Sequence, residues 1–232
     1  MARKQRFFLK GNPCHIVQRG HNRQACFFCD DDYGFYINSL EEALLRYHVQ
    51  LHAFVLMTNH VHLLLTPETS EGISRVMQSV GRDYVRYVNK HYQRTGTLFE
   101  GRYKASLIDS DLYYLQCQRY IELNPVRAMM VPHPANYHWS SYQFHALGKK
   151  INCLTPHELY LRLGDTEQSR LAAYKALFTE EFSASALQKI RQSLMHNYPL
   201  GDDRFRKQIE HAMGIKLGKC GPGRPELSDK RN

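Results

Sequence analysis

Two histidines in an otherwise apolar stretch are the first residues of this sequence that could do chemistry. His60 and His62 belong to FVLMTNHVHLLLTP, residues 54–67, whose apolar run predicts a buried strand. Side chains alternate faces along a strand, so both imidazoles point the same way, roughly 6–7 Å apart, and can converge on one ion or anionic group. Taken alone, such a pair is more often core packing than a metal site, so other residues must decide.

A possible third ligand and a nucleophile occur together in RYIELNPVRA, residues 119–128. Tyr120 and Asn124 are four residues apart and share one face of the predicted helix. If this face covers the histidines, the Asn124 amide oxygen can complete a metal site and Tyr120 lies beside whatever the ion binds. Pro125 disfavours the helical conformation at Asn124, so the helix bends or ends there. Tyr113, two turns earlier, is a rival nucleophile.

A tyrosine beside a divalent cation suggests phosphodiester chemistry. The cation makes the phosphodiester more electrophilic and stabilises the negative charge that develops on it. The phenol can then attack phosphorus and hold the broken strand as a phosphotyrosine ester, which a free 3′-hydroxyl can later reseal without ATP. A set of two imidazoles and one amide leaves coordination positions open, as catalytic rather than structural metal sites do.

Basic residues indicate a polyanionic partner. The net charge is +9, and Arg82, Arg86, Lys90 and Arg94 recur every four residues with Asp83 as the only acid nearby. A solvated helix face is the alternative. The segment FEGRYKA adds charge beside Phe99 and Tyr103, which are expected to stack on unpaired bases. The residues predicted to contact nucleic acid are Arg19, Arg75, Arg82, Arg86, Lys90, Arg94, Arg102 and Lys104.

The elements that must position these residues follow a recognisable order. Strands are predicted at residues 14–20, 49–57, 60–67 and 97–108, and helices at 30–49, 71–91 and 111–128, the last capped by Asp109 or Ser110. The order β-α-β-β-α-β-α is that of a ferredoxin-like α+β fold with one helix added. We therefore expect an antiparallel sheet with helices on one face, the histidine strand in its centre and the other face open to a ligand.

The remainder of the chain predicts a helical C-terminal extension and a basic tail. We assign residues 1–147 to the nuclease-like domain, 148–218 to short helices, the first capped by Thr155 with Pro156 following, and 219–232 to a tail disordered when free. The tail's GPGRP is weak evidence for minor-groove binding. Cys26 and Cys29 form a C-x-x-C without a second close pair, which favours buried thiols beside Phe27 and Phe28 over zinc. Neither a membrane-length apolar run nor a signal peptide is evident, which predicts a cytoplasmic protein without membrane contact.

These motifs together resemble one family. His60-Val61-His62 is similar to the HUH motif, and RYIELNPVRA to the tyrosine helix of single-tyrosine HUH transposases. The stretches HIVQRGHNRQ, LFEGRYKA, ELNPVRA and WSSY resemble the REP-associated tyrosine transposases most closely, over about residues 7–147. The resemblance implies a nuclease and strand transferase of the bacterial nucleoid, acting on single-stranded DNA at repetitive extragenic palindromic hairpins. It implies Mg²⁺ or Mn²⁺ held by His60, His62 and Asn124, and Tyr120 as nucleophile; relatives often carry Gln where this chain has Asn124.

Three other functions are compatible with parts of this pattern. A hairpin-DNA-binding regulator without turnover would not need the four site residues. A replication or conjugation initiator commonly uses paired tyrosines or another topology, and no phosphate-binding Gly-rich loop of a helicase is present. A zinc-stabilised RNA-binding module lacks the second cysteine pair. We expect a monomer rather than a homodimer with active sites shared between subunits.

Overall fold

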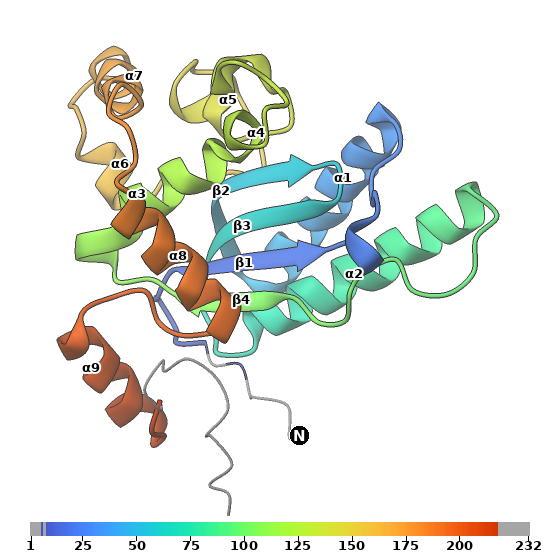
Figure 1. Ribbon diagram of the computed structural model, residues 1–232, viewed down its shortest axis with the longest axis horizontal. Coiled ribbons are helices and arrows are strands. Elements are labelled where there is room, and N and C mark those ends of the chain that lie inside the picture. Colours follow the sequence, from blue (N-terminus) through green and yellow to red (C-terminus); the bar gives the residue numbers. More distant parts are fainter. Residues whose placement is uncertain (1–5, 7, 218–232) are drawn as a thin grey trace, which may run out of the picture.

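The computed structural model describes Arg6 and residues 8–217, with only the backbone described for residues 110–112. Its centre is a four-stranded antiparallel sheet in the order β2-β3-β1-β4 (Figure 1). The strands are β1 (Cys14–Arg19), β2 (Val49–Met57), β3 (His60–Pro67) and β4 (Lys104–Leu107). The predicted α+β ferredoxin-like class is confirmed, and β3 with its histidines is central.

Two helices cover one face of the sheet, as predicted. Helix α1 (Asp30–Tyr47) and helix α2 (Gly72–His91) pack against each other and against β2 and β3 (Figure 1). Their buried side chains recur at helical spacing, including Tyr36, Leu40 and Leu44 on α1. The strand residues on this side are Cys14, Ile16, Val61, Leu63 and Leu65 together with Phe54 and Leu56. This layer is the larger of the two cores.

The opposite face is not open. Helix α3 (Ser110–Glu122) packs on β2 and β3, and helix α8 (Ala184–His196) packs on β4 and β1 (Figure 1). Strand residues Val17, Val55 and Leu64 join side chains of α3 and α8 in a second core. The expectation of helices on one face only is therefore incomplete, because α3 covers β2 and β3 on this face and α8, from the C-terminal part of the chain, covers β4 and β1.

Three predicted boundaries move. The strand expected at residues 97–108 shortens to β4, because the chain turns tightly at Gly101, whose φ is +69° and whose N–H bonds to Phe99. The helix expected at 111–128 breaks at Leu123, and a single turn, α4 (Asn124–Arg127), follows with Pro125 near its start. In the extension, the first helix is α6 (Glu158–Leu161), capped by His157 rather than Thr155.

The remaining elements are short. They are η1 (His21–Arg23), η2 (Pro134–Asn136), α5 (Tyr142–His145), α7 (Glu167–Ala176) and α9 (Asp203–Met213). Helices α7, α8 and α9 confirm the predicted helical character of the extension. The whole of the predicted tail, 219–232, lies outside the described residues, and GPGRP with it. Within the described part, no helix is long and apolar enough to cross a membrane.

Candidate active site

The histidine pair lies on the sheet face that α3 covers. His60 and His62 of β3 stand opposite Arg19 and Val17 of β1, and their ring centroids are 5.0 Å apart. Their shared face, inferred from the strand period, is thus confirmed by the register. His62 is 4% exposed and His60 is partly buried, so the pair is accessible mainly from the Arg19 end of the strands.

Each imidazole of the pair is oriented by a neighbour through Nδ1. His62 Nδ1 shares a hydrogen bond of 2.8 Å with Nε2 of His15 on β1, and His60 Nδ1 lies 2.6 Å from Oδ1 of Asn59. In both rings this leaves Nε2 as the nitrogen available to a ligand, the arrangement found where a second residue fixes a metal-binding histidine.

Burial keeps these imidazoles neutral. It lowers the pKa of His15 to about 3 and that of His60 to about 4, where the charge of Arg19 adds to the effect. The pKa of His62 is also well below 6.5, first through burial and then through neighbouring His15 and His60. A neutral imidazole is the form that binds a metal ion, so the pair is in the coordinating form at neutral pH.

Tyr120 of α3 reaches the same place. Its ring centroid is 5.9 Å from that of His62 and 5.8 Å from that of His15, and the residue is 5% exposed. Arg127, on α4 one turn beyond the helix break, places its guanidinium carbon 4.6 Å from the centroid of the Tyr120 ring. Tyr113, the rival, contacts Lys189 of α8 instead, and no ring contact joins it to the histidines among the described residues.

Asn124 sits at the break between α3 and α4. Its side-chain N–H groups donate to the carbonyls of Tyr120 and Ile121, at 2.9 and 3.1 Å. The bond to Ile121 satisfies a carbonyl whose helical partner would be residue 125, since Pro125 has no N–H, and the bond to Tyr120 satisfies the carbonyl one residue earlier at the helix end. They also fix the amide so that Oδ1 is its remaining polar atom. In the sequence, the signal for this geometry was Pro125 directly after Asn124, four residues after Tyr120. It correctly predicted a break in the helix.

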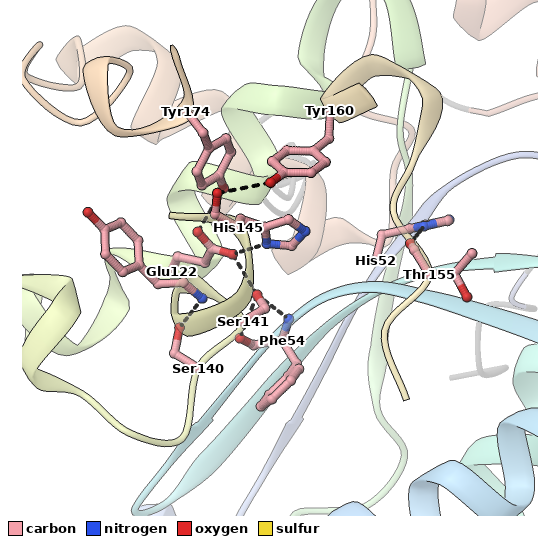
Figure 2. A network of polar contacts seen from close by, with 10 residues as sticks. His52, Phe54, Glu122, Ser140, Ser141, His145, Thr155, Tyr160 and Tyr174 are labelled. Carbon is pink, nitrogen blue, oxygen red and sulfur yellow. Dashed lines mark hydrogen bonds and ion pairs between the residues drawn. The ribbon is translucent and has the colours of Figure 1, made fainter. Parts of the chain in front are cut away.

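A buried carboxylate holds the end of α3 in place (Figure 2). Glu122, fully buried, accepts hydrogen bonds from Ser141 Oγ at 2.6 Å and from Tyr174 at 2.7 Å, and contacts His145 Nδ1 at 2.8 Å. Ser141 in turn bonds the backbone of Phe54 on β2. The helix that carries Tyr120 is therefore tied to β2, to α5 and to α7 of the extension.

The residues predicted to contact DNA separate into groups. Arg19 and Lys104 lie on the histidine face, at the ends of β1 and β4. Arg82, Arg86 and Arg102 line a cavity between α2 and residues 97–103. Arg75 pairs with Glu71, Lys90 is exposed on α2, and Arg94 lies over the ring of Phe28.

Two aromatic residues are less exposed than the sequence suggested. Phe99 and Tyr103 are buried, and the ring of Tyr103 is already covered by Arg6, 4.0 Å from its centroid. Both residues nevertheless belong to the lining of the cavity between α2 and residues 97–103, so the stacking of unpaired bases on them stays a prediction. The C-x-x-C also differs from expectation: Cys26 is buried, but Cys29 is exposed and caps α1.

Sequence reasoning missed His15, Glu122 and Arg127. A polar residue inside the strand CHIVQRG was a signal for His15, but only the pairing of β1 with β3 shows that it meets His62. Glu122 and Arg127 lie within the motif that held Tyr120 and Asn124. The role of Glu122 depends on Tyr174 of α7, and that of Arg127 on where α4 places it after the break, and neither follows from the motif.

The residues present fit a divalent metal ion. Among the described residues, no three His, Cys, Asp or Glu side chains form a group that could hold one, so a site here needs the Asn124 amide beside the two imidazoles. The amide oxygen, with water and phosphate, is a ligand of the type that suits Mg²⁺ and Mn²⁺, and the two neutral imidazoles make the set a mixed nitrogen and oxygen one for a divalent ion.

Comparison with known proteins gives one family match and two similar solved structures. Residues 10–124 match the family model described as IS200-like transposase. A solved REP-associated tyrosine transposase bound to a REP hairpin is similar in fold, with a TM-score of 0.56 and 16% identity, over 68% of this chain and 93% of that one. A candidate transposase from Deinococcus radiodurans R1 has 22% identity over 52% of this chain and 96% of that one, with a TM-score of 0.37. No curated protein matches the sequence.

Proposed function

Since residues 10–124 of this chain belong to the IS200-like transposase family, we propose that it is a metal-dependent single-stranded DNA endonuclease and strand transferase. The nucleophile is Tyr120, and His60, His62 and Asn124 hold Mg²⁺ or Mn²⁺. The observation that carries the proposal is the position of the Tyr120 ring, within 6 Å of the His62 ring, on a helix that ends at Glu122, two residues before Asn124.

The cleavage step follows from this position. The Tyr120 oxygen attacks phosphorus, an O–P bond forms, and the bond from phosphorus to the 3′ oxygen breaks. The phenol gives up its proton to water and the leaving 3′ oxygen takes one up, so that the 5′ end stays on the protein as a phosphotyrosine ester. Attack by a 3′-hydroxyl reverses the step and rejoins a strand.

The protein contributes orientation and charge to this step. When bound, the metal ion supplies Lewis-acid polarisation of the phosphate. His15 and Asn59 hold the two imidazoles, the α3 carbonyls hold the Asn124 amide, and Arg127 places a positive charge beside the tyrosine ring. Arg19 and Lys104 lie on the same face, where they can bind the phosphates that flank the scissile bond.

We further propose that the substrate is a palindromic DNA hairpin with a single-stranded flank, of the repetitive extragenic type. The similar fold of a REP-associated transposase bound to a REP hairpin supports this substrate class. Such a substrate places the protein in the cytoplasm, at the nucleoid.

The test is formation of a covalent adduct. Wild-type protein is incubated with Mn²⁺ or Mg²⁺ and labelled single-stranded DNA containing a REP-type hairpin and flank, and adducts are resolved on a denaturing gel. We expect a metal-dependent adduct with wild type, none with Tyr120→Phe, and an undiminished one with Tyr113→Phe, the matched control on the same helix.

The other outcomes contradict the proposal in different ways. An adduct that persists in Tyr120→Phe and vanishes in Tyr113→Phe would transfer the nucleophile to Tyr113. Absence of an adduct with a panel of flanks, while both proteins bind the hairpin equally well, would favour the hairpin-binding regulator.

A further inference from the structure

A cavity of about 800 Å³ lies between α2 and residues 97–103, away from the candidate active site. Its walls include Met77 and Gln18, and Met77 belongs to the core on the α1 and α2 side of the sheet. Since side chains alternate along β1, Gln18 faces this cavity while its neighbour Arg19 faces the histidines. The volume is within the range of roughly 300–1,000 Å³ that is usual for ligand sites.

The cavity is strongly basic. Four arginines line it: Arg6, Arg82, Arg86 and Arg102. Arg82 and Arg86 are exposed, one turn apart on α2, and neither has an ion-pair partner among the described residues. No carboxylate belongs to the described lining. Several like charges around one hollow favour an anionic occupant, since it relieves their mutual repulsion.

Gln18 is a second and independent sign of a ligand. It is 8% exposed, and its Oε1 is buried without a hydrogen-bond partner among the described residues. Buried amide oxygens in proteins are nearly always paired, so an orphan in the wall of a cavity points to a donor that comes from outside the chain. The amino and imino groups of unpaired bases are such donors.

The walls also offer apolar surface between the charges. Val85 lies between Arg82 and Arg86 in the lining, and Gly81 and Met77 lie one and two turns before it on the same helix. A base can lie against such a surface while its phosphates contact the guanidinium groups. Together, charge, an unpaired amide and apolar wall match the parts of a nucleotide.

We propose that this cavity, between α2 and residues 97–103, binds unpaired nucleotides of the DNA substrate outside the cleavage site, with Arg82 and Arg86 on phosphates and Gln18 on a base. The choice of DNA rests on the proposed function. The site itself lies on the far face of the sheet from Tyr120, so it holds a flanking segment of the strand rather than the scissile phosphate.

Equilibrium binding of a labelled oligonucleotide tests the site. Fluorescein-labelled (dT)₁₂, which forms no hairpin, is titrated with the full chain in EDTA across several salt concentrations, followed by fluorescence anisotropy. For the double variant Arg82→Ala/Arg86→Ala we expect an affinity at least about tenfold lower and a salt slope smaller by about 1.4, since each phosphate contact to a single strand contributes about 0.7.

Two further variants make the test specific. Gln18→Glu puts a negative charge into the cavity at nearly constant size, and we expect it to weaken (dT)₁₂ binding as the arginine variant does. Arg46→Ala removes an exposed arginine of α1 outside the cavity and should leave the affinity within about twofold of wild type. Thermal melts check that each variant is folded; if Gln18→Glu is not, the exposed arginine pair still decides.

Unchanged affinity and salt slope in the arginine variant would overturn the inference, as would an equal loss for duplex and single-stranded DNA. This result is separable from the adduct assay. If wild type forms an adduct and the arginine variant binds (dT)₁₂ as well as wild type does, the cavity site is contradicted and the cleavage activity is not. If the arginine variant loses (dT)₁₂ binding and wild type forms no adduct, the proposed cleavage activity is contradicted and the cavity site is not.

Discussion

At the scale of single residues, the environment of Tyr120 is defined by one cation and two neutral rings. Arg127 lies over its ring, and one nitrogen of Arg127, Nη1, is buried without a partner among the described residues. His15 and His62 stay uncharged because they are buried. A phosphate entering this site therefore meets the positive charge of Arg127 and Arg19, while the imidazoles keep their lone pairs for coordination.

His15 shares a hydrogen bond with Nδ1 of His62, so in the proposed metal site it would position a ligand rather than act as one, and its removal tests this role. We expect His15→Ala to weaken Mn²⁺ binding by about 10–100-fold, the usual effect of removing the residue that orients a ligating histidine. Isothermal titration of the metal-free protein with Mn²⁺ measures the change. His211→Ala, an exposed histidine on α9, is the control, and an affinity for Mn²⁺ equal to that of wild type in His15→Ala would contradict the role.

At the scale of elements, the position of Tyr120 depends on how α3 ends. Pro125 and Asn124 stop the helix, and Glu122 ties this end to Ser141, His145 and Tyr174. Burial, together with Glu122, keeps the pKa of Tyr174 well above 10, so its hydroxyl remains protonated and donates. The extension thus contributes one of the three groups that hold the active-site helix, although it carries none of the proposed catalytic residues.

Tyr174→Phe tests this connection with little change in shape. The substitution keeps the buried ring but removes one donor from a buried carboxylate, so we expect the free energy of unfolding to fall by about 1.5–3 kcal/mol. Urea unfolding followed by circular dichroism measures it. The partly buried Tyr47 of α1 gives the matched control, Tyr47→Phe, for which we expect less than about 0.5 kcal/mol. Equal losses in the two variants would show that the Glu122 contact contributes nothing.

At the scale of the whole molecule, the chain after residue 138 closes both edges of the sheet. Along β2, Trp139, Ser141 and Thr155 pair with its backbone, at Leu56, Phe54 and Leu51. Along β4, Leu200 bonds to Leu107 and Asp109, and the Asn197 side chain accepts from the N–H of Ala105. An exposed edge strand invites pairing with another chain, and here both edges are covered.

The covered edges favour a monomer. Light scattering coupled to size exclusion should give a mass near 27 kDa at all concentrations in the micromolar range, because sheet extension between two copies would first have to displace the covering segments. A mass near twice this value would contradict the prediction and would reopen active sites shared between subunits.

The cover of β2 should loosen in acid. His52 bonds Thr155 through Nδ1 at 2.8 Å and Thr66 through Nε2 at 2.9 Å, and burial lowers its pKa to about 4. Between pH 6.5 and 4 the unfolded chain binds a proton at His52 that the folded protein does not, so stability is present above pH 6.5 and falls as the pH drops. The loss is on the order of 1.4 kcal/mol per pKa unit of difference.

Unfolding free energies of wild type and His52→Gln at several pH values measure this effect. We expect the variant to be less stable at pH 7.5 and to lose less stability between pH 6.5 and 4. His211→Gln should retain the wild-type pH profile, since His211 is exposed. Parallel profiles for wild type and His52→Gln would assign the acid sensitivity to other buried histidines, such as His15.

Much of the architecture followed from the sequence because its determinants are local. Strand alternation set the shared face of His60 and His62, helical spacing identified the buried faces of α1 and α2, and proline at 125 located the end of α3. The order of these elements was sufficient for the ferredoxin-like topology, since short connections leave few ways to pair the strands. The motif around Tyr120 and Asn124 then indicated the chemistry.

Only the tertiary structure decided which distant residues meet. That His15 contacts His62 depends on the register of two strands, and that Glu122 is satisfied depends on Tyr174, 52 residues later. The extension was expected either to contact a partner or to cover the sheet, and the packing of α8 on β4 and β1 shows that it covers part of the second face. Tyr103 was expected to stack on unpaired bases but is buried. A local pattern shows which side chains share a face, but burial and partner choice are set by packing across the whole chain, so these features could not be predicted from the sequence alone.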